Sequence, residues 1–177
     1  YVVAESTQLR GADVFLGGPS GSTVTGTCNV MTAACLAKGR TVIRAAACEP
    51  EVADLGRFLN AAGACISGLG SSTIEITGVE EFASVTHTVV PDRIEAATFA
   101  IAAAATRGSI SIHDVLPSQM TSVLDALRAI GVDIQVASDR VDIATSGDLT
   151  GVELAAFPFP GIPTDTQAQF MALLTTV

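Results

Sequence analysis

The sequence contains no tryptophan, one tyrosine and two histidines among 177 residues, and aromatic residues make up only 5% of it. Because 49% of the residues are hydrophobic, any core must be built mainly from alanine, valine, isoleucine and leucine. No Ser-His-Asp or Cys-His pattern and no C-x-x-C spacing is present, which argues against a hydrolytic triad and a structural zinc site. We therefore expect no metal and no cofactor, and four reduced thiols at Cys28, Cys35, Cys48 and Cys65.

Basic residues are also scarce: nine Lys and Arg face eighteen Asp and Glu, which gives a formal net charge of −9. This charge disfavours nucleic-acid backbones and anionic membranes as partners, although a small anion can still be bound locally by backbone N–H groups. The longest apolar run, residues 99–105, is too short to span a bilayer. The residues after Tyr1 show no secretory leader pattern. We expect a cytoplasmic protein.

The sequence repeats itself with an offset of 69 residues, which places Lys38-Gly39 over Arg107-Gly108. Each copy contains an alanine-rich helix, a strand, a second helix and two more strands, and a third copy opens at Pro163-Thr164-Asp165. Such a period predicts an α/β fold built from one supersecondary unit. The expected strands are 12–16, 41–44, 64–67, 73–77, 86–90, 109–115, 132–136, 140–144 and 152–155, and the expected helices are 23–38, 50–63, 92–107, 117–131 and 164–177. The last helix has no C-terminal stop signal, so we expect a piece of a longer chain.

Three residues, Thr23, Asp92 and Asp165, occupy the same position in the repeat, at the start of a helix. Thr and Asp are common N-caps, so capping alone can explain them. Helix N-termini brought together by pseudo-symmetry would also suit an anion such as a phosphate. Residues 17–27 are rich in Gly, Ser and Thr and lead into a helix, but they match neither the P-loop nor the dinucleotide fingerprint. Both interpretations stay open.

Four segments together resemble one family: Ser-Thr-Val-Thr-Gly-Thr from residue 22, Ala-Cys-Glu-Pro-Glu-Val from 47, Val-Pro-Asp-Arg-Ile-Glu from 90, and Phe-Pro-Gly-Ile-Pro-Thr-Asp-Thr-Gln-Ala-Gln-Phe from 159. The family is UDP-N-acetylglucosamine 1-carboxyvinyltransferase, an enolpyruvyl transferase of peptidoglycan precursor synthesis. The resemblance implies two inside-out α/β barrel domains, each built from three β-α-β-α-β-β units, that close on substrate. Residues 1–90 would be the later part of one domain and residues 91–177 the first, incomplete part of the second.

The resemblance also implies a reaction and its residues. The enolpyruvyl group of phosphoenolpyruvate passes to the 3′-hydroxyl of UDP-N-acetylglucosamine by addition and elimination, and phosphate is released. Asp165 matches the aspartate that acts as base on the sugar hydroxyl. The segment that binds the uridine diphosphate matches Gly21, Ser22, Thr23 and Val24, and Glu49 and Asp92 match carboxylates that face the cleft.

Several family features have no counterpart in the sequence. These are the early Lys-Asn pair, the mobile loop with its reactive Cys or Asp, and the later arginines that bind phosphoenolpyruvate. We therefore expect this polypeptide to be inactive without the remainder of the full-length enzyme, which would be its partner.

Three alternatives remain open from the sequence. The first is 3-phosphoshikimate 1-carboxyvinyltransferase, which shares the fold and the donor but uses another acceptor. The second is a homologue that binds nucleotide-sugar without turnover. The third, a clamp around DNA, is disfavoured because such clamps need basic helices, whereas residues 23–38 carry one positive charge.

Overall fold

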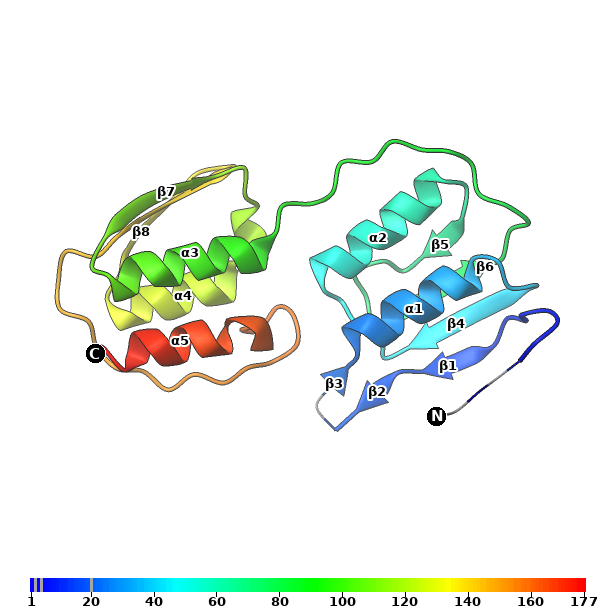
Figure 1. The fold of residues 1–177 in the computed structure, drawn as a ribbon, viewed down its shortest axis with the longest axis horizontal. Helices are drawn as coiled ribbons and strands as arrows, with labels where there is room; N and C mark the ends of the chain where they lie inside the picture. Colours follow the sequence, from blue (N-terminus) through cyan, green and yellow to red (C-terminus); the bar gives the residue numbers. More distant parts are fainter. Residues whose placement is uncertain (2, 4, 20) are drawn as a thin grey trace. The chain divides into compact units, whose positions relative to one another are not determined.

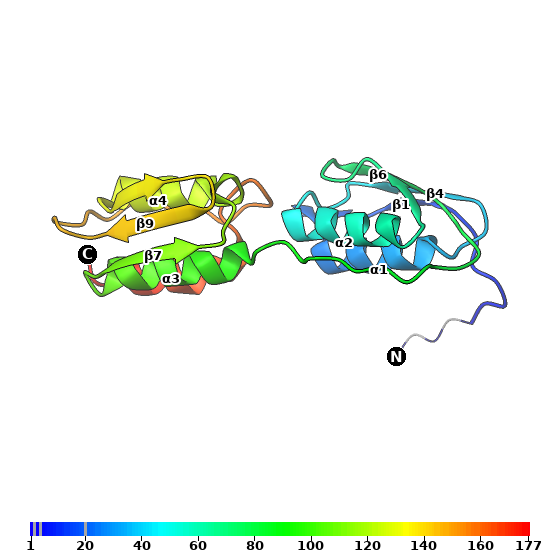
Figure 2. The ribbon, with the colours of Figure 1, turned by 90° about the horizontal axis from the view of Figure 1, so that it is seen from above.

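A computed structural model describes residues 1–177 except residues 2, 4 and 20. The chain divides into two compact units, Tyr1–Val90 and Pro91–Val177, each with its own sheet, helices and core (Figure 1, Figure 2). We call them unit 1 and unit 2. Their assignment to the later and earlier parts of two transferase domains stays a prediction.

Unit 1 contains the full predicted sequence of elements, strand-helix-strand-helix-strand-strand. Its sheet has the order β1-β4-β6-β5, in which β1 is parallel to β4 and the other pairs are antiparallel. A short hairpin of β2 and β3 precedes the first helix. The bounds are β1 Asp13–Phe15, β2 Gly17–Gly18, β3 Gly21–Ser22, α1 Val24–Ala34, β4 Arg40–Arg44, α2 Pro50–Ala61, β5 Cys65–Ser67 and β6 Thr73–Thr77.

The sheet of unit 1 has one covered and one open face because its strands alternate apolar and polar residues. Ile43, Ile74 and Ile76 are fully buried in the core formed with α1 and α2. The opposite face carries two exposed ion pairs, of which Arg40–Glu75 has an N–O distance of 2.6 Å. Burial of the isoleucine face, at about 25 cal/mol per Å² of apolar surface, is the main term that fixes the register. The second ion pair joins Arg44 and Asp13.

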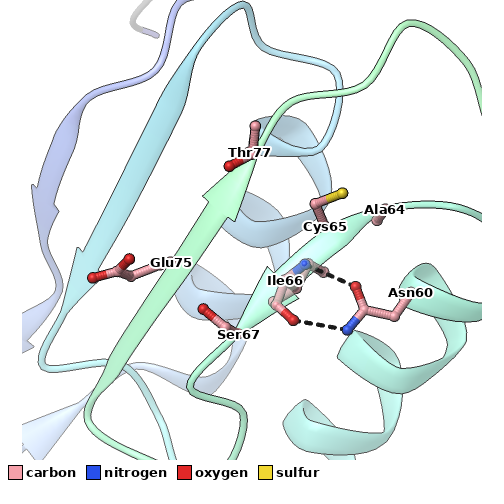
Figure 3. A pocket seen from close by; sticks show the side chains of 7 residues that line it. All are labelled: Asn60, Ala64, Cys65, Ile66, Ser67, Glu75 and Thr77. Carbon is pink, nitrogen blue, oxygen red and sulfur yellow. Dashed lines mark hydrogen bonds between the residues drawn. The ribbon is translucent and has the colours of Figure 1, made fainter.

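The edge strand β5 is closed by a side chain instead of another strand (Figure 3). The Asn60 carboxamide on α2 donates to the carbonyl oxygen of Ile66 and accepts from its N–H, both at 2.8 Å. These are the backbone groups that an incoming strand would otherwise pair with. Beside them lies an open groove of about 420 Å³, lined by Asn60, Ala64, Cys65, Ile66, Ser67, Glu75 and Thr77.

Unit 2 repeats the order of elements from the first helix onward. Its antiparallel sheet has the order β7-β9-β8. Helix α3 packs against the sheet through alanines, and α5 packs against α3. The bounds are α3 Arg93–Ala105, β7 Ser109–His113, the 3-10 turn η1 Pro117–Gln119, α4 Thr121–Ile130, β8 Asp133–Val136, β9 Arg140–Ala144, the 3-10 turn η2 Thr164–Thr166 and α5 Gln167–Leu174.

Two predicted strands are wrong. Residues 86–90 and 152–155 form no strand, although Ala156 makes an isolated bridge with Ile162. The β-branched residues of 86–90 and the apolar-polar alternation of Val152-Glu153-Leu154 made both segments look like strands, but a strand also needs a partner edge. In the described part of the chain, neither segment has one.

Several helix bounds also differ from the prediction. Pro117 opens a 3-10 turn, and α4 begins only at Thr121. Helix α1 stops at Ala34, and the last predicted helix shortens to a 3-10 turn followed by α5. The glycine-rich segment before α1 forms the β2-β3 hairpin, and its residue 20 lies outside the described residues. Neither unit forms a closed barrel within the described residues.

Candidate functional site

The predicted diphosphate-binding segment forms the β3 strand and the first turn of α1. Thr23 is the N-cap of α1, and its Oγ1 accepts a hydrogen bond from the N–H of Gly26 at 3.2 Å. A Cβ on Gly26 would lie 2.5 Å from the Thr23 methyl group, so the glycine allows this cap to form. The first turn of α1 carries no acidic residue, and the first N–H groups of a helix have no intrahelical acceptor. This end of α1 is therefore suited to an anion.

A buried hydroxyl ties this turn to the segment that carries Glu49. Thr27 is fully buried, and its Oγ1 donates to the Thr23 carbonyl oxygen at 2.7 Å. The same oxygen accepts from the N–H of Ala47 at 3.0 Å. Two predicted site elements, the α1 N-terminus and the segment before α2, are thus brought together. Sequence reasoning missed Thr27, because its partner lies 20 residues away.

The carboxylates at the start of α2 make the surroundings of the nearby thiols negative. Glu49 precedes α2 and is 7% exposed. The pKa of Cys28 is raised, mainly by burial and further by the charges of Glu51 and Glu49. Burial and the Glu49 charge also raise the pKa of Cys48. These thiols are therefore poor nucleophiles at neutral pH, because the thiolate is the reactive form.

This electrostatic setting predicts an order of thiol reactivity. At pH 7.5, iodoacetamide should modify the exposed Cys65 before Cys28 and Cys48, with rates followed by peptide mass spectrometry. A raised pKa leaves less thiolate at any given pH, so the Cys28 and Cys48 rates should keep rising well above pH 9. In guanidinium chloride all cysteines should react alike. Faster labelling of Cys28 than Cys65 in the folded chain would contradict the prediction.

In unit 2, Asp92 is the N-cap of α3. Its Oδ1 accepts from the N–H groups of Ile94 at 2.8 Å and Glu95 at 3.1 Å. The interpretation of Asp92 as a cap is therefore confirmed, while its predicted contact with substrate stays a prediction. The next residue, Arg93, is buried, and its guanidinium lies 5.4 Å from the ring centre of Phe159. This contact joins α3 to the proline-rich loop before η2.

Asp165 differs from the other two repeat positions. The expectation that it begins an α-helix as Thr23 and Asp92 do is wrong, because it lies inside the 3-10 turn η2. The turn is held by Thr166, whose N–H and Oγ1 both donate to the Pro163 carbonyl oxygen, at 3.0 and 2.9 Å. Asp165 is exposed, and no described residue makes a hydrogen bond or ion pair with its carboxylate. The carboxylate is thus available to a ligand.

The turn η2 is fixed to α3, so Asp165 and Asp92 belong to one cluster of elements in unit 2. The Nε2 of Gln169 donates to the Thr98 hydroxyl at 3.0 Å and joins α5 to α3. Gln169 belongs to the motif that begins at residue 159, but the spacing of the sequence does not show that Thr98 is its partner. The structure therefore presents two groups of predicted site residues. Gly21, Ser22, Thr23, Val24 and Glu49 lie in unit 1, and Asp92 and Asp165 lie in unit 2.

Among the described residues, no helix has the length and the apolar character that a membrane crossing requires. No group of three or more His, Cys, Asp or Glu side chains in this part of the chain is arranged to hold a metal ion.

Comparison with known proteins shows strong similarity over nearly the whole chain. Residues 2–177 match the family model for EPSP synthase (3-phosphoshikimate 1-carboxyvinyltransferase). The UDP-N-acetylglucosamine 1-carboxyvinyltransferase of Methylacidiphilum infernorum is 47% identical over 174 residues, covering 98% of this chain and 41% of that protein. The enzyme of the same name from Desulfatibacillum aliphaticivorans is 43% identical over 99% of this chain and 42% of its own length. The chain thus spans about two fifths of these relatives.

Solved structures show the same fold at lower sequence identity. The enolpyruvyl transferase NikO from Streptomyces tendae matches with a TM-score of 0.82 and 21% identity, over 97% of this chain and 43% of that one. EPSP synthase from Acinetobacter baumannii matches with a TM-score of 0.53 and 22% identity, over 94% and 37% of the two chains. The expected fold, a part of the enolpyruvyl transferase architecture, is therefore confirmed.

Proposed function

Because this chain belongs to the EPSP synthase (3-phosphoshikimate 1-carboxyvinyltransferase) family, we propose that it is part of an enzyme that transfers the enolpyruvyl group of phosphoenolpyruvate to the 3′-hydroxyl of UDP-N-acetylglucosamine. The observation that carries the choice of acceptor is the 47% identity, over 98% of the chain, to a relative named for that acceptor. The enzyme would work in the cytoplasm, in peptidoglycan precursor synthesis, with the remainder of the full-length protein as its partner.

Asp165 is the proposed base. The sugar hydroxyl gives its proton to the Asp165 carboxylate as its oxygen forms a bond to C2 of phosphoenolpyruvate, and C3 takes up a proton. Loss of a proton from C3 and of phosphate from C2 then restores the double bond and gives the enolpyruvyl ether. The exposure of Asp165, and the absence of a described partner for its carboxylate, support this role.

The N-terminus of α1 is the proposed site for the diphosphate. Backbone N–H groups at Thr23 and Val24 and the hydroxyl of Ser22 are donors of the kind that bind phosphate oxygens. Glu49 and Asp92 would accept hydrogen bonds from sugar hydroxyls. The buried Thr27 hydroxyl supports a joint role for the α1 turn and the Glu49 segment, because it is hydrogen-bonded to both.

Shikimate 3-phosphate is the alternative acceptor, and the description of the matched family model favours it. A homologue that binds nucleotide-sugar without turnover is the other alternative. Fold similarity cannot choose among these, because one fold can serve different acceptors.

A chimera tests the proposal. Residues 1–177 replace the matched segment of the Methylacidiphilum infernorum relative, and phosphate release is measured with phosphoenolpyruvate and either acceptor. We expect release with UDP-N-acetylglucosamine only, and none from the 177-residue chain alone. Release with shikimate 3-phosphate only would replace our choice of acceptor. Binding of UDP-N-acetylglucosamine without release would indicate the non-catalytic homologue.

A further inference from the structure

One position in the second helix of each repeat bonds to the segment that leaves that repeat. At the second helix the repeat offset is 68 residues, one fewer than at Gly39 and Gly108, and it places Gly63 over Gly131. The same offset places Asp54 over Ser122. Asp54 lies in α2 and Ser122 in α4. Each contacts a stretch of chain more than 30 residues further along, beyond the last strand of its sheet. The two contacts are therefore equivalent in the repeat, although the residue types differ.

In unit 1 the contact is made by the buried carboxylate of Asp54. It holds two points of residues 78–90, which follow β6 and which we call the leaving segment. Asp54 is 8% exposed, and its Oδ2 accepts from the N–H of Val90 at 3.2 Å. The same oxygen lies 3.1 Å from Nε2 of His87. Because a carboxylate only accepts, this bond places a proton on that nitrogen. The His87 ring also packs edge-on against Phe58, with 5.7 Å between ring centres, and Arg57 lies 3.9 Å from Asp54 on the exposed side.

In unit 2 the contact is a single hydrogen bond. The Ser122 hydroxyl donates to the carbonyl oxygen of Gly161 at 3.0 Å. Gly161 lies in the loop that leads to η2, and a Cβ there would lie 2.6 Å from the Cβ of Phe157. The loop is thus held from α4 four residues before Asp165, just as the segment of unit 1 is held from α2 two residues before Asp92.

Among the described residues, the leaving segment of unit 1 has no strand partner, so such contacts are what fix it. Its N–H groups at Val79 and Ala83 donate to the carbonyl oxygens of Cys35 and Ala62, at 2.7 and 2.8 Å. The last attachment is Asp54 to Val90, and Asp92 is already the cap of α3. Only Pro91 separates the two attachments. The pyrrolidine ring of Pro91 fixes its φ angle, so the backbone between the two attachments has one rotatable dihedral fewer.

We propose that Asp54 is a positioning residue that shortens the tether between unit 1 and unit 2 by fixing His87 and Val90 to α2. Without it, the last hydrogen bond that fixes the segment among the described residues is that of Ala83, and the chain free of hydrogen bonds grows from about two residues to about nine. Effective concentration falls as roughly the −3/2 power of tether length, so one unit should meet the other about tenfold less often. The consequence for catalysis rests on the proposed function, in which both units contribute residues.

The first test needs no substrate. In the 177-residue chain, ¹⁵N relaxation should give backbone order parameters near 0.85 for residues 87–90, and Asp54→Ala should lower them below about 0.6. Each unit should also tumble faster in the variant. If Asp54→Ala does not fold, His87→Leu keeps the contact with Phe58 and removes one of the two bonds, and it should lower the order parameter of residue 87. Unchanged order parameters in a folded variant overturn the proposal.

Asn60→Ala is the matched control, because it removes two hydrogen bonds from the same helix without touching residues 87–90. It should destabilise unit 1 and leave these order parameters unchanged. A fall equal to that in Asp54→Ala would show a general loosening of unit 1 and would also overturn the proposal.

The second test uses the chimera. Asp54→Ala should raise KM for the nucleotide-sugar by up to about tenfold while kcat changes less than twofold, because the looser tether costs binding and not chemistry. A fall in kcat as large as the rise in KM would overturn the positioning role of Asp54. If the chimera releases no phosphate at all, the proposed function fails, while the relaxation result still decides the role of Asp54.

Discussion

Replacing Asp165 by asparagine in the chimera should lower kcat by about 10²- to 10⁴-fold, the usual contribution of a positioned general base. An amide cannot take the proton of the sugar hydroxyl, although it keeps the size of the side chain and one acceptor oxygen. Binding of UDP-N-acetylglucosamine should change far less than kcat. The measurement is phosphate release at saturating concentrations of both substrates, together with calorimetric binding of the nucleotide-sugar.

The structure predicts that this substitution spares the fold. Asp165 is exposed, and η2 is held by Thr166 and Pro163, so nothing described depends on the Asp165 carboxylate. The matched control is Asp148→Asn, another exposed aspartate of unit 2 that lies outside the proposed site. It should leave kcat unchanged. If Asp165→Asn keeps kcat within threefold of the parent, Asp165 is not the base.

The elements that the sequence predicts well are those whose signals are local. The caps at Thr23 and Asp92 follow from residue type and position, and both form the expected hydrogen bonds. The isoleucines of β6 alternate with polar residues, so the strand and its buried face are predicted together. The order of elements follows from the repeat, because one supersecondary unit imposes the same order each time.

What the sequence could not predict depends on contacts between distant residues. Residues 86–90 are rich in β-branched side chains, as strands are, yet they are held by the Asp54 side chain and not by a neighbouring strand. Asp165 is shifted from the cap position because the loop before it ends in Pro163, which starts a 3-10 turn. Thr27 resembles any helical threonine, and only the fold shows that its hydroxyl reaches Ala47.

The choice of acceptor is a separate matter from the fold. The NikO and EPSP synthase structures share this architecture at 21% and 22% identity, so the arrangement of strands and helices carries no information on the acceptor. In the proposed function, the side chains near the α1 N-terminus and near η2 make that choice. A buried contact that holds one of these segments in place is therefore expected to influence the function.

Thr27→Val should destabilise unit 1 by about 2 kcal/mol, because it leaves the N–H of Ala47 buried without an acceptor. Valine has nearly the shape of threonine, so the loss is that of the hydroxyl and not of packing. The amide of Ala47 should lose most of its protection in native-state hydrogen exchange. In the chimera, KM for the nucleotide-sugar should rise, because the α1 turn and the Glu49 segment are no longer tied.

Thr32→Val provides the matched comparison on the same helix. The Thr32 hydroxyl donates to the Cys28 carbonyl oxygen at 2.8 Å, but it is exposed, and that carbonyl also belongs to the helix ladder. Water can replace the lost bond, so stability should change by less than about 0.5 kcal/mol. The difference between the two variants isolates the buried bond to Ala47. If both lose the same stability, the cost arises from valine in the helix, and the tie between α1 and Glu49 contributes nothing measurable.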